Sequence, residues 1–256
     1  MSNRQSKKSS TLPSVKAVFG QEEDLNITEP LKNMASNFQD KLPVVISIGV
    51  DVAGKTFSYI ELSRLQSWEN LLNKINSQNQ KNPPKNLSLM FPLMQSQNLE
   101  GKFKNILEQA RQNVNNALNH NCQFSISDLK DRITQSLSNQ DWNEVDWANF
   151  WVKEFSRVLG YNQENCQLNK LHEYLKQKNL KIIFLIDGLE NNFPALAYNN
   201  FQQTALKALI ENLPNKLTEI RQSNLGLIVF LHRDSLRKTI KQNSGQFESL
   251  YSEYRF

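Results

Sequence analysis

The sequence predicts an α/β fold in which mostly parallel strands alternate with helices. Four short apolar runs, at residues 44–48, 87–91, 181–187 and 225–231, have the length and composition of buried strands. Longer amphipathic stretches lie between them, so helices are expected to connect consecutive strands. The first run leads directly into a glycine loop and then into a further apolar periodicity. The local order is therefore strand, loop, helix.

The glycine loop covers residues 49–56, GVDVAGKT, and matches the pattern G-x-x-x-x-G-K-[ST] at every position. In such a loop the backbone N–H groups turn inward and bind phosphate oxygens, provided that side chains do not intrude. Gly49 and Gly54 supply that room, Lys55 places an ammonium group between the outer phosphates, and Thr56 offers a hydroxyl to Mg²⁺. The other expected nucleotide contacts are Val50, Asp51, Val52, Ala53 and Phe57.

On these residues the chain resembles the P-loop NTPases. The resemblance implies a three-layer α/β fold, a bound nucleotide and Mg²⁺. The loop lacks the extra glycine that is common in ATPases, and Asp51 puts a carboxylate near the phosphates, as in some small GTPases. One amphipathic helix is expected to follow over residues 57–75.

An upstream segment, residues 18–25 with the sequence VFGQEEDL, resembles the F-x-G-R-E-x-E-L box that precedes the loop in many AAA+ and STAND ATPases. In those proteins an apolar residue beside the glycine packs on adenine, so the resemblance places Phe19 and Gly20 at the base. Gln21 stands where the family has arginine. The alternative is an ordinary turn followed by a helix from Glu22.

The third apolar run ends in Asp187, at the edge of the sheet where ligands of open α/β folds bind. Asp187 can accept a hydrogen bond from water on Mg²⁺, and Glu190 can orient or deprotonate the attacking water. Residues 187–190, DGLE, resemble the hhhhD-G-L-D/E signature of STAND ATPases. The alternatives are that Asp187 caps the next turn and that Glu190 is an ordinary exposed side chain.

The fourth run is followed by His232, Arg233 and Asp234. P-loop ATPases place a polar sensor of the γ-phosphate at this position, and the guanidinium of Arg233 can contact phosphate oxygens with two hydrogen bonds. Arg233 is therefore the third catalytic candidate, with Lys55 and Glu190. Its alternative role is a structural ion pair with Asp234 or Glu190.

The segment at about 90–178 is predicted to be a large helical insertion. Helices are expected at 99–118, from Ser125 or Ser127 through Leu137, and at 142–159 before Gly160. The aromatic stripe of the last helix is typical of a core, and the alternative is a partner groove. A further helix at 201–213 is expected to end or kink at Pro214.

The chain ends and composition carry weaker signals. Residues 1–13 are polar and basic, which predicts a disordered tail, and residues 14–256 form the expected NTPase domain without a C-terminal helical lid. Part of the net charge of +5 lies in the first sixteen residues, and because short basic tails without interleaved aromatic residues are common, a solvated tail is favoured over an arm that binds nucleic acid or anionic membrane. Two cysteines without metal-ligand spacing indicate a reduced, cytoplasmic protein, and no segment has the composition of a membrane span or secretory signal.

The functional hypothesis is an ATP-binding domain of STAND or AAA+ type, similar to the ATPase module of bacterial multidomain regulators, some of which carry a MinD/ParA-like domain. The resemblance implies slow Mg²⁺-dependent ATP hydrolysis used as a switch, with other protein domains or a second copy as partners. The main alternative is a binding or interaction module whose glycine loop holds nucleotide without hydrolysis or is empty. A GTPase is disfavoured because residues 169–172 and 215–218 lack the aspartate of N-K-x-D, and a small-molecule kinase lacks an identifiable acceptor site.

Overall fold

The structure is a computed structural model, and it describes residues 27–50, 54–76, 87–96, 99–120, 124–139, 141–163 and 166–256. Several expected features lie outside these ranges. They are the basic tail at 1–13, the adenine candidates Phe19 and Gly20, and the loop interior Asp51, Val52 and Ala53.

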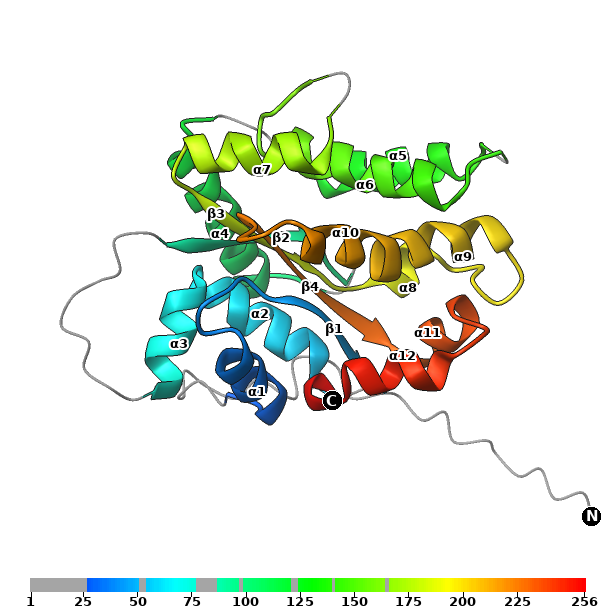
Figure 1. Ribbon diagram of the computed structural model, residues 1–256, viewed down its shortest axis with the longest axis horizontal. Coiled ribbons are helices and arrows are strands. Elements are labelled where there is room, and N and C mark those ends of the chain that lie inside the picture. The colour runs from blue at the N-terminus through cyan, green and yellow to red at the C-terminus, as the bar shows by residue number, and fades with distance from the viewer. Residues whose placement is uncertain are drawn as a thin grey trace, which may run out of the picture.

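Four parallel strands form one sheet in the described chain, with the order β1-β4-β3-β2 (Figure 1). The strands are β1 (Val44–Gly49), β2 (Ser88–Met94), β3 (Lys181–Ile186) and β4 (Leu225–His232). They correspond to the four apolar runs, and nearly all of their residues are buried. Strands covered on both faces need apolar side chains on both faces, which explains continuous rather than alternating runs. The predicted α/β fold with a parallel sheet is confirmed.

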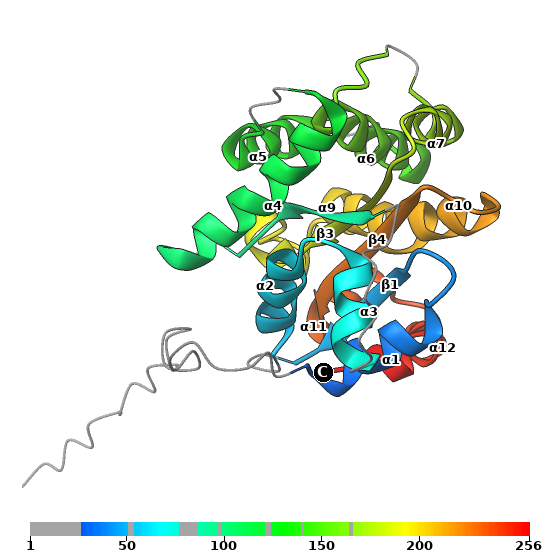
Figure 2. The same ribbon diagram turned by 90° about the vertical axis from the view of Figure 1, so that its left-hand side faces the viewer.

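Helices cover both faces of the sheet and make three layers (Figures 1 and 2). On one face, Ile46, Phe184 and Val229 share a core with α6 (Glu144–Val158), α7 (Leu168–Gln177), α9 (Asn200–Lys207) and α10 (Leu213–Glu219). On the other face, Val45, Ile183 and Ile228 pack with α1 (Glu29–Asn37), α2 (Lys55–Leu65) and α3 (Trp68–Asn76). Adjacent strand residues thus alternate between the two cores.

Both edges of the sheet are covered. Helix α4 (Lys102–Leu118) lies against β2 and contributes Leu107 to one core and Val114 to the other. At the β1 edge, the Ser47 hydroxyl donates to the carbonyl of Tyr254 at 2.7 Å, and the Phe256 amide donates to the carbonyl of Ile48 at 3.0 Å. The C-terminal residues therefore cover this edge and pair one of its backbone carbonyl groups.

Three short elements precede that contact. They are α11 (Arg233–Thr239), α12 (Ser244–Leu250) and the 3₁₀ turn η3 (Ser252–Tyr254). The ring of Phe256 lies 6.2 Å from that of Phe230, centroid to centroid. A Cβ atom at Gly49 would lie 2.8 Å from the Cβ of Phe256, so the C-terminal residue packs directly on the start of the glycine loop.

The single helix expected at 57–75 was wrong, because the chain breaks between α2 and α3. Gln66 adopts a left-handed conformation with φ 65° and ends α2. Its carbonyl accepts a hydrogen bond from the Met90 amide at 2.9 Å, and Ser67 forms a bridge with Leu89. The break therefore lets the chain pair with β2, a long-range contact that helical periodicity does not reveal.

Pro214 does not end its helix. Helix α9 continues through a π-helical turn, η2 (Ala208–Asn212), into α10, and Pro214 lies in the first turn of α10. A proline lacks the N–H needed for an α-helical bond, and the wider turn before it accommodates this loss. None of the described helices combines the length and apolar character needed to cross a membrane.

Between β2 and β3 the described chain holds α4, α5 (Ile126–Ser136), α6 and α7. Ser125 caps α5 by accepting from the Asp128 amide at 3.2 Å, and Gly160, with φ 72°, follows the end of α6. The aromatic stripe of α6 belongs to the core as predicted, since Trp147, Trp151 and Phe155 are fully buried. The insertion is thus organised around α6.

Candidate functional site

The predicted site residues that the structure describes converge at one edge of the sheet because parallel strands end on the same side. Gly49 at the end of β1 pairs in register with His232 at the end of β4. Asp187 follows the last residue of β3, and β4 lies between β1 and β3. The glycine loop, Asp187 and Arg233 therefore come from three consecutive strands of the sheet.

Gly54 is the residue that starts α2. It has φ 79° and ψ 6°, a left-handed conformation that glycine adopts without steric cost. Gly54 has no side chain that could cap the helix, so no side-chain oxygen of the N-cap residue stands in front of the first-turn N–H groups of α2. Such N–H groups, together with the positive end of the helix dipole, form a site suited to an anion.

Thr56 and Asp187 form the central contact of the site. The Thr56 hydroxyl donates to Oδ2 of Asp187 at 2.8 Å, although the two residues are 131 positions apart. Asp187 is 4% exposed. Two oxygen atoms that could ligate a metal ion, the Thr56 hydroxyl and Oδ2 of Asp187, thus lie together between the first turn of α2 and the end of β3.

The electrostatic environment of Asp187 is set mainly by burial, which raises the pKa of its carboxyl group to about 6. The hydrogen bond from Thr56 lowers the pKa and the negative charge of Glu190 raises it, while the Gly188 amide and Lys55 provide smaller lowering effects. Because burial makes the ionised form of Asp187 unfavourable, a cation that reaches the carboxylate would stabilise it.

Lys55 lies back across the glycine loop. Its ammonium group donates to the carbonyl of Val50, and its side chain passes the start of the loop, within 3.3 Å of where a Gly49 Cβ atom would be. Phe57, the last of the predicted contact residues, lies in the first turn of α2 and is half-buried. The lysine charge is therefore held at the loop.

Glu190 lies in the short helix α8 (Leu189–Asn192), just beyond Asp187, and is exposed. Gly188 between them has φ 69°, and a Cβ atom there would lie 2.5–2.6 Å from the backbone of Gln95 and Ser96. The Asp187 amide also donates to the carbonyl of Met94 at 3.1 Å. The segment after β2 thus buttresses the turn that carries the two acids.

Arg233 has a structural ion pair, and its partner is Glu248 rather than Asp234 or Glu190. Glu248 is buried at the end of α12 and faces three guanidinium groups, from Arg233 at 3.5 Å, Arg237 at 3.6 Å and Arg255 at 3.7 Å. The Nε atoms of Arg233 and Arg255 are buried without a hydrogen-bond partner in the described chain. One carboxylate therefore balances an excess of positive charge beside the loop.

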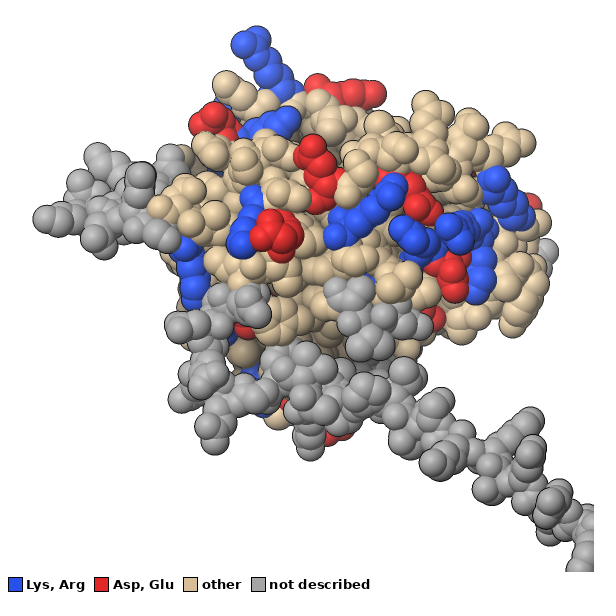
Figure 3. Space-filling view, turned by 90° about the horizontal axis from the view of Figure 1, so that it is seen from below, with Lys and Arg blue, Asp and Glu red and all other residues tan. Residues whose placement is uncertain are grey.

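Figure 3 shows Lys and Arg side chains gathered with acidic ones toward the side where α11 and α12 lie in Figure 1. His232 does not join the cluster through its Nδ1 atom, which accepts from the Asp234 amide at 3.2 Å and caps α11.

The sequence pattern did not single out Arg111, which holds the segment next to Asp187. Its Nε donates to the carbonyl of Pro92 at 2.8 Å and its Nη2 to Oε1 of Gln95 at 3.0 Å. The side chain is buried, and burial lowers the pKa of its guanidinium group. The available signal was its position between Leu107 and Val114 on the apolar face of α4, where a charge needs a buried partner.

The donor set is consistent with Mg²⁺ held partly by a nucleotide. Within the described ranges, no three His, Cys, Asp or Glu residues gather as a metal cluster. Mg²⁺ commonly keeps several waters and binds through one or two carboxylates plus substrate phosphates, so Thr56 and Asp187 are the described residues that could hold it. Comparisons of the chain with protein-family models, curated proteins and solved structures found no match.

Proposed function

We propose that this chain is an ATP-binding P-loop domain of STAND or AAA+ type, with slow Mg²⁺-dependent ATP hydrolysis that serves as a regulatory switch. The observation that carries the proposal is the 2.8 Å hydrogen bond between Thr56 and Asp187 at the start of α2. A hydroxyl after the loop lysine and a strand-end carboxylate are the two protein groups that phosphate-bound Mg²⁺ requires. Their meeting across an intervening strand supports a functional pairing.

Each remaining residue has a chemical role in this proposal. Lys55 and the first-turn N–H groups of α2 bind phosphate oxygens and neutralise their charge. Glu190 orients the attacking water or accepts its proton, from an exposed position close enough to Asp187 to raise its pKa. When bound, Mg²⁺ would supply further neutralisation of charge on the transferred phosphoryl group.

The C-terminal elements are the candidates for the moving part of the switch. Arg233 shares Glu248 with Arg255, and the adjacent residue Phe256 packs against Gly49. In our proposal a γ-phosphate competes with Glu248 for Arg233, which alters the contacts that hold α12 and the last residues on the loop. Binding and hydrolysis would then favour two different arrangements of this segment.

Titration calorimetry with ATP, ADP and GTP in the presence of Mg²⁺ tests nucleotide binding. We expect ATP to bind with a Kd on the order of micromolar and GTP to bind more weakly. Lys55→Ala should abolish ATP binding, and the matched charge-removing variant Lys216→Ala, on α10, should bind as the wild type does. Equal ATP affinity in Lys55→Ala would remove the assignment, and a preference for GTP would favour a GTPase.

A non-hydrolysing nucleotide-binding module is the second candidate, favoured by Asp51 in the loop and by Gln21 in the upstream box. Phosphate release by wild type and Glu190→Gln separates the two. An ATPase should lose turnover in the variant and keep ATP binding. A passive module should show no turnover in either protein.

A further inference from the structure

A polar groove lies on the outer face of the helical insertion, away from the glycine loop. It has a volume of about 750 Å³, and its floor is one face of α6, from Asp146 to Arg157. The 11 positions between these residues correspond to about 16 Å along a helix. Side chains of α5 form one side of the groove, and residues at the start of α7 form the other. The groove is therefore elongated rather than compact.

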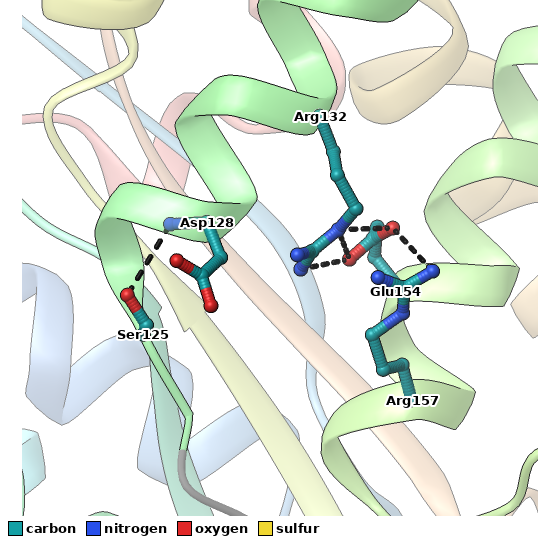
Figure 4. A network of polar contacts seen from close by, with 5 residues as sticks. All are labelled: Ser125, Asp128, Arg132, Glu154 and Arg157. Carbon is teal, nitrogen blue, oxygen red and sulfur yellow. Dashed lines mark hydrogen bonds and ion pairs between the residues drawn. The ribbon is translucent and has the colours of Figure 1, made fainter.

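One end of the groove is basic and partly rigid. Glu154 is buried, with a side chain 1% exposed, and it accepts hydrogen bonds from Nε and Nη2 of Arg132 at 2.7–3.0 Å. Arg157 lies 3.9 Å from the same carboxylate, so two guanidinium groups approach it from two helices (Figure 4). A guanidinium fixed in this way loses little conformational entropy when it binds a further anion.

Two lysines extend this basic end. Lys153 precedes Glu154 on α6, and Lys170 lies on α7; both are exposed and line the groove. Neither has a carboxylate within ion-pair distance in the part of the chain that the structure describes. Their charges add to those of the arginines, so this end attracts anionic groups.

The other end is aromatic, polar and slightly acidic. Trp142 is half-buried, with its ring held edge-on against Trp147 at 5.1 Å and near Phe150 at 6.1 Å. Asp146 and the amide side chains of Gln135 and Asn149 line the same part of the groove. Amides provide donors and acceptors together, as a peptide backbone requires, and the indole face suits an apolar side chain.

We propose that this groove binds an extended acidic peptide segment of a partner protein. About five extended residues span 16 Å at roughly 3.3 Å each. Carboxylates at one end of the segment would meet Lys153, Lys170 and Arg132, and an apolar or aromatic side chain at the other would pack on Trp142. A nucleic-acid strand fits less well, because its evenly spaced phosphates would also face Asp146.

The test is fluorescence anisotropy with labelled synthetic hexapeptides and the full chain. One probe is Phe-Gly-Ala-Glu-Asp-Glu, a second has the reverse order, and a matched third replaces the acids by Gln and Asn. We expect one of the acidic peptides to bind with a Kd on the order of tens of micromolar and the amide peptide at least about tenfold more weakly. Equal binding of acidic and amide peptides, or none by either acidic peptide, would overturn the proposal.

Charge-reversal variants locate the binding site. Lys153→Glu/Lys170→Glu should weaken the acidic peptide by about tenfold or more, whereas Lys181→Glu/Lys241→Glu, exposed lysines outside the groove, should change it by less than about twofold. Circular dichroism confirms that both variants fold. Equal losses of peptide affinity in the two double variants would show that the peptide binds to the net charge of the protein, and would contradict the proposal.

Two further experiments test which kind of molecule binds in the groove. Trp142→Ala should weaken the Phe-containing peptide, yet leave a Gly-containing analogue almost unchanged, because only the former has a ring to pack. Decameric oligothymidylate should not displace the acidic peptide. Its displacement of the peptide with higher affinity would replace our proposal by a nucleic-acid site.

Discussion

Thr56, in the first turn of α2 after β1, donates a hydrogen bond to Asp187, which follows β3, although β1 and β3 are not neighbours in the sheet. β4 separates β1 from β3. The hydroxyl compensates only part of the cost of burying the carboxylate, since the pKa of Asp187 still lies at about 6. The ionised carboxylate of Asp187 therefore remains unfavourable in this position, and a bound cation would reduce that free-energy cost.

Asp187→Asn should stabilise the protein near neutral pH. The folded-state pKa of about 6 exceeds the ordinary value of 3.8, so the favourable contribution of Asp187 is present below pH 3.8 and is lost as pH rises through 6. A difference of about two pKa units corresponds to roughly 3 kcal/mol. Urea unfolding at pH 7.5 should show up to about this gain in the free energy of unfolding, and at pH 4 almost none.

Asp40→Asn is the matched control for that experiment. Asp40 is exposed and does not contribute to the pKa of Asp187, so its neutralisation should change stability little. A gain for Asp187→Asn that stayed constant between pH 4 and pH 7.5 would show that burial of the charge is not its cause.

Glu248→Gln should destabilise the C-terminal elements, because Arg233, Arg237 and Arg255 lose their shared counter-charge. We expect a loss on the order of 1–3 kcal/mol at low ionic strength. Sulfate should restore the melting temperature more than sodium chloride does at matched ionic strength, because a bound anion replaces the carboxylate. Glu253→Gln, at an exposed contact with Asn37, should show neither effect; an equal response would argue against the cluster.

Gly188→Ala should be costly for two reasons, and Gly101→Ala separates them. Both glycines have positive φ, 69° and 60°, but a Cβ atom clashes with backbone only at Gly188. Gly101→Ala should cost about 1–3 kcal/mol for its positive-φ conformation alone, with φ 60° and ψ −127°. Gly188→Ala should cost several kcal/mol and lower nucleotide affinity, since Asp187 and Glu190 flank the displaced turn. Comparable unfolding free energies for the two variants would contradict the contact with Gln95 and Ser96.

Arg111→Met should unfold more easily because the carbonyl of Pro92 loses its buried donor. Methionine fills similar space, so the expected loss of about 1–3 kcal/mol reports the polar contact rather than a cavity. Arg111→Lys should recover only part of this loss, because an ammonium group cannot reproduce the guanidinium geometry that reaches Pro92 and Gln95 together. Denaturant titration of the three proteins measures the difference, and wild-type stability in Arg111→Met would refute the role.

Local patterns were sufficient for the strands, the start of α2 and several helix ends. Buried parallel strands require continuous apolar runs, and a helix cap such as Ser125 acts within its own turn. The break at Gln66, by contrast, depends on its bond to Met90, and the continuation past Pro214 depends on a π turn. Neither feature can be recognised from the spacing of apolar residues along the sequence.

The candidate site also has one part that the sequence predicted and another part that it did not. The glycine loop and the strand-end acid could be recognised along the chain, because their chemistry requires particular residue types at short spacing. The pairing of Arg233 with Glu248 and the bracing role of Arg111 could not, because each depends on side chains from separate elements.

By itself, the amino-acid sequence determined where strands form and which residues reach their carboxyl ends, since both follow from local hydrophobicity and backbone preference. Only the tertiary structure decided that β4 lies between β1 and β3, that Thr56 contacts Asp187, and that Phe256 covers Gly49. The physical reason is that these three contacts arise from the packing of segments that are distant in the sequence. The free energy of that packing is shared among many contacts, so no single segment of the sequence predicts it.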